Sequence, residues 1–102
     1  MKKQSKSSLL RWFFRNYIHE KRVDVAKGLG RCVAGDESIE YLRGIAHQLQ
    51  VVESWVEGEN FDSFVQEVIP LWREVRSKKG SSQFDKGCYE VMQEVDELLQ
   101  EH

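Results

Sequence analysis

The sequence predicts an all-α fold, a single-domain bundle of three to four amphipathic helices. Two observations carry this prediction. The 102 residues include one proline, and no stretch alternates apolar and polar residues as a half-buried strand would. Apolar residues instead recur at helical spacing in several stretches, which glycines and short polar segments separate. We expect residues 1–8 to form a flexible basic tail and residues 9–102 to form the single helical domain.

The first predicted helix begins near Leu9, where Ser7 and Ser8 can cap it, and runs to about Lys27. Glycines at 28 and 30 weaken a helix there by roughly 1 kcal/mol each relative to alanine, and Gly35 is expected to end whatever continues. Its apolar residues fall in one sector, which predicts a buried stripe. These residues are Leu10, Phe13, Phe14, Tyr17, Ile18 and Val25. Lys21 lies in the same sector and must either extend past the stripe or face a partner.

The second predicted helix begins at Asp36 or Ser38 and stops at Gly58. Its stripe consists of Ile39, Tyr41, Leu42, Ile45, Ala46, Leu49, Val52 and Val56. The connection to the first helix is short, so the two helices are expected to form an antiparallel hairpin. Gly44 interrupts the second helix at a cost of about 1 kcal/mol, which close approach by another helix would explain. We expect that helix to belong to the same chain rather than to a second subunit.

A third helix is predicted from Asn60 or Asp62, and a fourth from about Asp85, with the third and fourth helices packed across the hairpin. The stripe of the third comprises Phe61, Phe64, Val65, Val68, Leu71, Trp72 and Val75. Pro70 removes a backbone hydrogen bond, so we expect a kink or break within residues 66–70. The stripe of the fourth comprises Cys88, Val91, Met92, Val95, Leu98 and Leu99.

Charge is distributed unevenly along the chain. Residues 1–31 hold nine basic and two acidic residues, a net charge of +7, whereas residues 32–102 hold six basic and fifteen acidic residues, a net charge of −9. Such asymmetry raises the question of an anionic partner. No run of about 18 apolar residues could span a membrane. Two arginines interrupt the apolar segment near the N-terminus, which argues against a secretory signal, so a cytoplasmic protein is expected.

The sequence gives little sign of catalytic chemistry. The chain is too short for a doubly wound sheet or a (β/α)₈ barrel. No phosphate-binding glycine motif or nucleophile motif occurs, and no histidine has a second metal-ligand residue type at i+3 or i+4 that would suggest a site. Cys32 and Cys88 lack the spacing of a zinc or redox motif and are expected to serve as small buried side chains. We therefore predict no enzyme activity, no catalytic residues, no metal and no cofactor.

The first helix carries the candidate partner-binding residues. Arg11, Arg15 and Arg22 cluster beside its apolar stripe, while Trp12 and His19 share the opposite face. A tryptophan outside the stripe favours a protein contact, because tryptophan and arginine are common interface anchors. Trp12 could instead cover a neighbouring helix within the domain, or the helix could lie on an anionic membrane surface. In a further interpretation, the arginines together with Lys2, Lys3 and Lys6 contact the phosphates of a nucleic acid.

The segment from Glu40 to Leu49, which reads EYLRGIAHQL, resembles a pattern in small uncharacterised phage and prophage helical proteins. In these, a basic, aromatic first helix leads through a short turn into a second helix of YLRG type, and the likeness covers residues 9–56. Ile45 follows Gly44 directly here, without the residue that usually separates them. The resemblance implies a phage-encoded accessory or structural protein, located in the host cytoplasm, that acts by association.

The hypothesis from the sequence is a non-enzymatic helical interaction module that binds a protein of unknown identity. Two alternatives stay open. One is a nucleic-acid-binding protein that uses the basic N-terminal tail and the first helix. The other is a self-assembling homo-oligomeric structural protein, in which oppositely charged ends meet.

Overall fold

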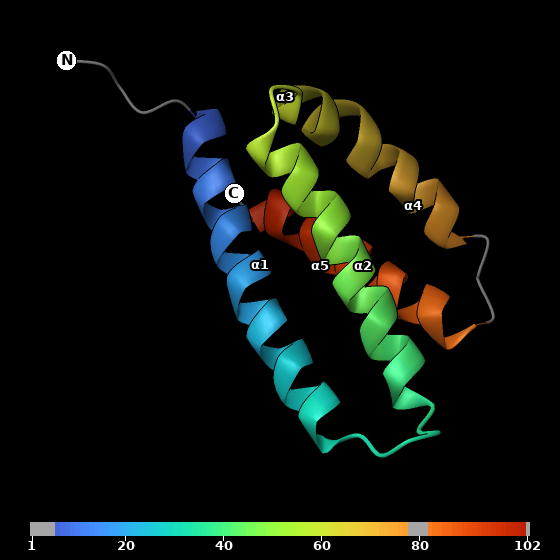
Figure 1. Ribbon diagram of the computed structural model, residues 1–102. Coiled ribbons are helices and arrows are strands. Elements are labelled where there is room, and N and C mark those ends of the chain that lie inside the picture. The colour runs from blue at the N-terminus through green and yellow to red at the C-terminus, as the bar shows by residue number, and fades with distance from the viewer. Residues whose placement is uncertain (1–5, 78–81, 102) are drawn as a thin grey trace.

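The computed structural model describes residues 6–77 and 82–101, and within these ranges the fold is all-α, as predicted. The helix α1 (Lys6–Arg31) and the helix α2 (Ser38–Glu57) form an antiparallel hairpin. A second helical segment follows α2 and consists of α3 (Phe61–Ser63), a π-helical turn (Phe64–Val68) and α4 (Ile69–Ser77). The helix α5 (Gln83–Glu101) crosses behind α2 (Figure 1) and also contacts α1 and α4.

The helix α1 is longer than predicted at both ends. It begins at Lys6, so Ser7 and Ser8 lie within its first turn rather than capping it, and residues 6–8 of the expected tail are helical. At the other end it continues through both glycines to Arg31. The close packing of Leu42 against Gly28 explains one of these glycines, because an added Cβ would lie 3.1 Å from Leu42 Cδ1. Gly35 follows in the hairpin connection with φ of +85°, a conformation that favours glycine.

The helix α2 lies at the centre of the bundle. Asp36 accepts a hydrogen bond from the Ser38 amide at 2.9 Å just before it, and Gly58 follows its last residue. One face of α2 contributes Ile45, Leu49, Val52 and Val56 to the core, where they meet the buried α1 residues Leu10, Phe14, Ile18 and Val25. Ala46, predicted in this stripe, is exposed.

Two glycines bring α2 and α5 together. A Cβ added at Gly44 would overlap the Phe84 carbonyl oxygen, and one added at Gly87 would overlap the Tyr41 carbonyl oxygen. Each helix therefore holds a glycine where the backbone of the other passes. This confirms the expected close approach at Gly44 and assigns it to a helix of the same chain.

The predicted irregularity before Pro70 is a π-helical turn. The Ile69 amide bonds to the Phe64 carbonyl, five residues earlier, and an α-helix resumes at once. A π-turn holds one more residue than an α-turn, so it moves the buried stripe forward by one position. Ile69 is fully buried and Trp72 is partly buried, whereas Leu71 is 57 % exposed. Leu71 and Val75 were thus wrongly predicted as core residues, because the stripe was continued across Pro70 with an unchanged α-helical phase.

Candidate functional site

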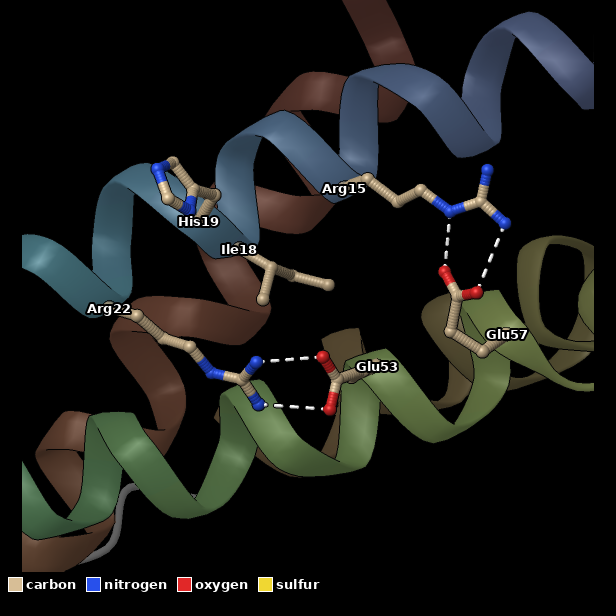
Figure 2. A pocket seen from close by; sticks show the side chains of 6 residues that line it. All are labelled: Arg15, Ile18, His19, Arg22, Glu53 and Glu57. Carbon is tan, nitrogen blue, oxygen red and sulfur yellow. Dashed lines mark hydrogen bonds and ion pairs between the residues drawn. The ribbon is translucent and has the colours of Figure 1, made fainter.

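Two arginines of the predicted site are bound to glutamates of α2. Arg15 contacts Glu57 through Nε at 2.5 Å and Nη2 at 3.1 Å, and Arg22 contacts Glu53 through Nη1 at 2.7 Å and Nη2 at 3.0 Å. Figure 2 shows both bidentate pairs joining α1 to α2. Hydrogen bonds from the arginines lower the pKa of Glu53 and of Glu57 below the ordinary value. All four side chains are about half exposed, so water screens each pair and each adds only modestly to the stability of the fold.

A shallow depression of about 200 Å³ separates the two ion pairs. Ile18 lies between them, and His19 projects from α1 away from α2 (Figure 2). The charges around the depression balance, since each guanidinium faces a carboxylate. A small anion would have to displace a glutamate to reach either arginine, so we do not assign the depression as an anion site.

The remaining predicted residues divide between the two sides of α1. Arg11 places its guanidinium carbon 5.0 Å from the centre of the Phe61 ring, a cation–π contact within the fold. Trp12 is 52 % exposed, and its ring meets the neighbouring Phe13 edge-on at 5.1 Å. His19 is exposed. The structure thus places the three arginines in contacts within the chain and leaves Trp12 and His19 on the surface.

The arginine pairs had a signal in the sequence that the sequence analysis missed. Arg15 and Arg22 are seven residues apart on α1 and border its apolar stripe, which places them at the edge of any helix packed there. Glu53 and Glu57 are four residues apart and lie toward the other end of the antiparallel partner helix. Two acidic and two basic residues at helical spacing on adjacent antiparallel helices predict cross-helix ion pairs.

A second polar cluster lies between α1, α2 and α5. Lys21 Nζ lies 2.7 Å from Glu90 Oε2 and 2.9 Å from Glu94 Oε1, and these contacts account for its position in the apolar sector. Tyr17 donates to Glu94 at 2.7 Å, and Tyr41 donates to Glu90. Sequence reasoning missed this cluster, because periodicity within each helix does not show which side of α5 faces α1.

Opposing effects set the pKa values in this cluster. Burial raises the pKa of Glu90, but hydrogen bonds from Lys21 and Tyr41 and the charge of Lys21 together outweigh it, so the pKa of Glu90 lies below its ordinary value. Burial and the hydrogen bond to Glu90 raise the pKa of Tyr41 to about 12. At neutral pH the cluster therefore contains two neutral tyrosines, a charged lysine and a charged Glu90.

The outer α1 face, defined here as the side turned away from α2 and α5, is exposed along most of this helix. Its members share exposure to solvent and a spacing of three or four residues. They are Leu9, Trp12, Asn16, His19, Val23 and Ala26. Leu29, beside this face, is also exposed. Of these residues, the exposed tryptophan is of a type that is enriched in surfaces that contact other proteins.

Both thiols carry a raised pKa. Burial is the main cause for the buried Cys88 and for the partly buried Cys32. Cys88 donates weakly to the Gly44 carbonyl at 3.4 Å and Cys32 to the Gly28 carbonyl at 3.2 Å. The thiols are therefore protonated at neutral pH, the less nucleophilic state.

Over residues 6–77 and 82–101 no group of three or more histidine, cysteine, aspartate or glutamate residues could hold a metal ion. No described helix combines the length and the apolar character needed to cross a membrane. Lys2, Lys3 and the side chain of Lys6, which the nucleic-acid interpretation uses, lie outside the described part of the molecule. Comparison with family models, with curated proteins and with solved structures found no match to this chain.

Proposed function

We propose that the protein is a non-enzymatic helical module that binds a protein partner through the outer α1 face. The observation that carries the proposal is the exposure of Trp12, whose side chain is 52 % exposed. Tryptophan is among the strongest anchors when a partner buries it, so an exposed one on a helix face is suited to binding. Leu9 and Val23, 46 % and 41 % exposed, extend the apolar surface along the helix. Burying such residues against a partner removes apolar area from water at about 25 cal/mol per Å².

The arginines have a supporting role in this proposal. The buried core residues hold α1 against the bundle, and the pairs of Arg15 with Glu57 and of Arg22 with Glu53 help to orient the outer α1 face. A rigid face loses less conformational entropy on binding than a mobile helix would. The partner-binding role assigned to the arginines from the sequence thus becomes mainly a role in positioning Trp12 and His19.

The same contacts weaken the nucleic-acid alternative. Nonspecific binding to phosphates depends on lysines and arginines whose charge is available. On the described part of α1, Arg15, Arg22 and Lys21 each have a carboxylate within 3 Å. The phage assignment rests on the resemblance of residues 9–56, and the genes adjacent to this one test it.

Capture experiments with immobilised protein test the proposed function. The full chain and its Trp12→Glu variant are incubated with lysate of the source cell and, separately, with labelled protein of the same sequence. We expect Trp12→Glu to reduce the recovery of bound protein by about tenfold, because a buried charge replaces an apolar anchor.

The matched control is Leu71→Glu, which introduces the same charge at an equally exposed apolar residue on α4. This variant is expected to capture as much as the unmodified chain. Equal recovery by all three proteins would show that the outer α1 face is not the binding surface.

A further inference from the structure

The outer α1 face follows a seven-residue repeat. In heptad terms Leu9, Asn16 and Val23 take position a, and Trp12, His19 and Ala26 take position d. Phe14 and Lys21 then fall at position f, on the opposite side, where they face the rest of the bundle. These six positions are thus exposed over about five turns, where they could form the seam of a coiled coil, and the core of the domain lies on the other side of the same helix. A second helix can pack along this seam without contact with α2 or α5.

One residue of the seam bears on how many helices meet there. A single asparagine at position a specifies the register and the number of helices at some cost in stability, and Asn16 holds such a position. In a parallel dimer in register, each Asn16 would face Asn16 of the other copy, so that the two amides satisfy one another.

The charges beside the seam indicate whether the two α1 helices run parallel or antiparallel. Arg15 is at position g and Glu20 at position e, and in a parallel pair these residues face one another across the interface. Arg15 binds Glu57 through Nε and Nη2, and its third nitrogen, Nη1, points away from Glu57 (Figure 2). Glu20 is exposed. Each interface therefore offers two equivalent Arg15–Glu20 pairs.

The antiparallel arrangement lacks this complementarity. It brings position g of one helix against position g of the other, and the basic g residues are Arg15 and Arg22. When two antiparallel helices are aligned so that their seams overlap, Arg15 of one copy lies near Arg22 of the other, or the two copies of Arg22 lie near each other, and both arrangements are repulsive. In the parallel pair Arg22 faces Lys27, and Glu53 weakens that repulsion in the same way that Glu57 weakens the attraction between Arg15 and Glu20.

We propose that the partner of the outer α1 face is a second copy of this chain, packed α1 against α1 in a parallel dimer in register. This inference rests on the proposed function, since both use the same surface. A seam of three heptads that includes Asn16 and His19 is short and partly polar, so the dimer is a weak one. The two domains lie on opposite sides of the paired α1 helices.

Sedimentation velocity of the purified full chain, from roughly 1 to 300 µM, tests the inference. We expect the mass to rise from that of one chain to that of two. The variant Val23→Glu is expected to raise the dissociation constant by roughly a hundredfold, because two carboxylates would meet in the seam. The variant Glu20→Arg is expected to raise it by about tenfold, since it turns an attractive pair into a repulsive one.

Glu59→Arg, which makes the same charge change in the turn before α3, is the control and is expected to leave the dimer unchanged. Glu20 is exposed, so its variant reports on association even if Val23→Glu disturbs folding. A single-chain mass up to the highest concentration would overturn the inference, as would a dimer that neither variant weakens. If the chain is monomeric while Trp12→Glu still abolishes capture from lysate, the inference fails and the proposed function stands.

Discussion

Gly44 and Gly87 determine how closely α2 and α5 approach. Neither helix could keep its position if the glycine facing it carried a Cβ, because in each case the obstacle is a backbone carbonyl, which cannot rotate away. The same contact explains the Cys88 thiol, which reaches the Gly44 carbonyl across the narrow interface. Single atoms thus set the geometry of this crossing.

We expect Gly44→Ala and Gly87→Ala each to lower the free energy of unfolding by about 3 kcal/mol, because the two helices must move apart. Urea denaturation followed by circular dichroism measures this change. Gly30→Ala is the matched control, since an added Cβ there has no neighbour within 4 Å. It is expected to stabilise the helix by about 0.5–1 kcal/mol. Equal effects of the three substitutions would contradict the proposed role of the crossing.

The π-turn acts at the scale of a helical element. It inserts one residue ahead of Pro70, and the proline, which has no amide hydrogen, fits a place where the α-helical bonding pattern is already interrupted. The second part of the helix is thereby rotated, so that Trp72 rather than Leu71 packs beside Phe64, with ring centres 5.3 Å apart.

We therefore expect Ile69→Ala to lower the free energy of unfolding by about 3 kcal/mol, the usual cost of truncating a large buried aliphatic side chain. Leu71→Ala is expected to change it by less than about 0.5 kcal/mol, because Leu71 is mostly exposed. Denaturant titrations of the two variants make the comparison. A straight α-helix would give the opposite order, and that result would rule out the π-turn.

Helical periodicity was sufficient to predict the elements of this fold, because the apolar stripes of α1, α2 and α5 are regular. It could not predict where tertiary contacts override local preference. The packing of Leu42 on Gly28 carries α1 past the expected end near Lys27. The π-turn holds an extra residue, so the buried positions after it are shifted by one from those expected at a constant 3.6 residues per turn. The arginines were predicted to be available for a partner, because the sequence alone does not show that the glutamates of α2 lie beside them.

At the scale of the whole molecule, the first third of the chain is basic and the remainder acidic, and several of these opposite charges contact one another within the bundle. Arg15, Arg22 and Lys21 hold α1 to the acidic side chains of α2 and α5. Part of the asymmetry therefore serves to position α1. The pairs with Glu53, Glu57 and Glu90 lower the pKa of each of these carboxyls.

These shifts predict how stability depends on pH. A carboxyl whose pKa is lower in the folded state than in the unfolded chain stabilises the fold above its ordinary pKa of 4.5. This contribution disappears as the pH falls through the folded value. We expect the triple variant Glu53→Gln/Glu57→Gln/Glu90→Gln to be less stable than the parent at neutral pH, with the difference shrinking as the pH falls below about 4.5 and through the lowered pKa values of the folded state.

Thermal denaturation across this pH range measures the difference. The control is Glu59→Gln, which removes a carboxyl from the turn before α3, outside the α1 contacts. A difference between parent and triple variant that stays constant with pH would show that the ion pairs do not hold α1.

The positions of the tryptophans give the molecule two separate fluorescence signals. Trp55 stacks on Phe64 at 5.7 Å and Trp72 meets the same ring edge-on, so their emission reports on whether the core is intact. Trp12 lies in water on the outer α1 face, and its emission shifts to shorter wavelength when that face is covered. Quenching by iodide, which reaches Trp12 first, separates the two signals. Association and unfolding can thus be followed in one unlabelled sample.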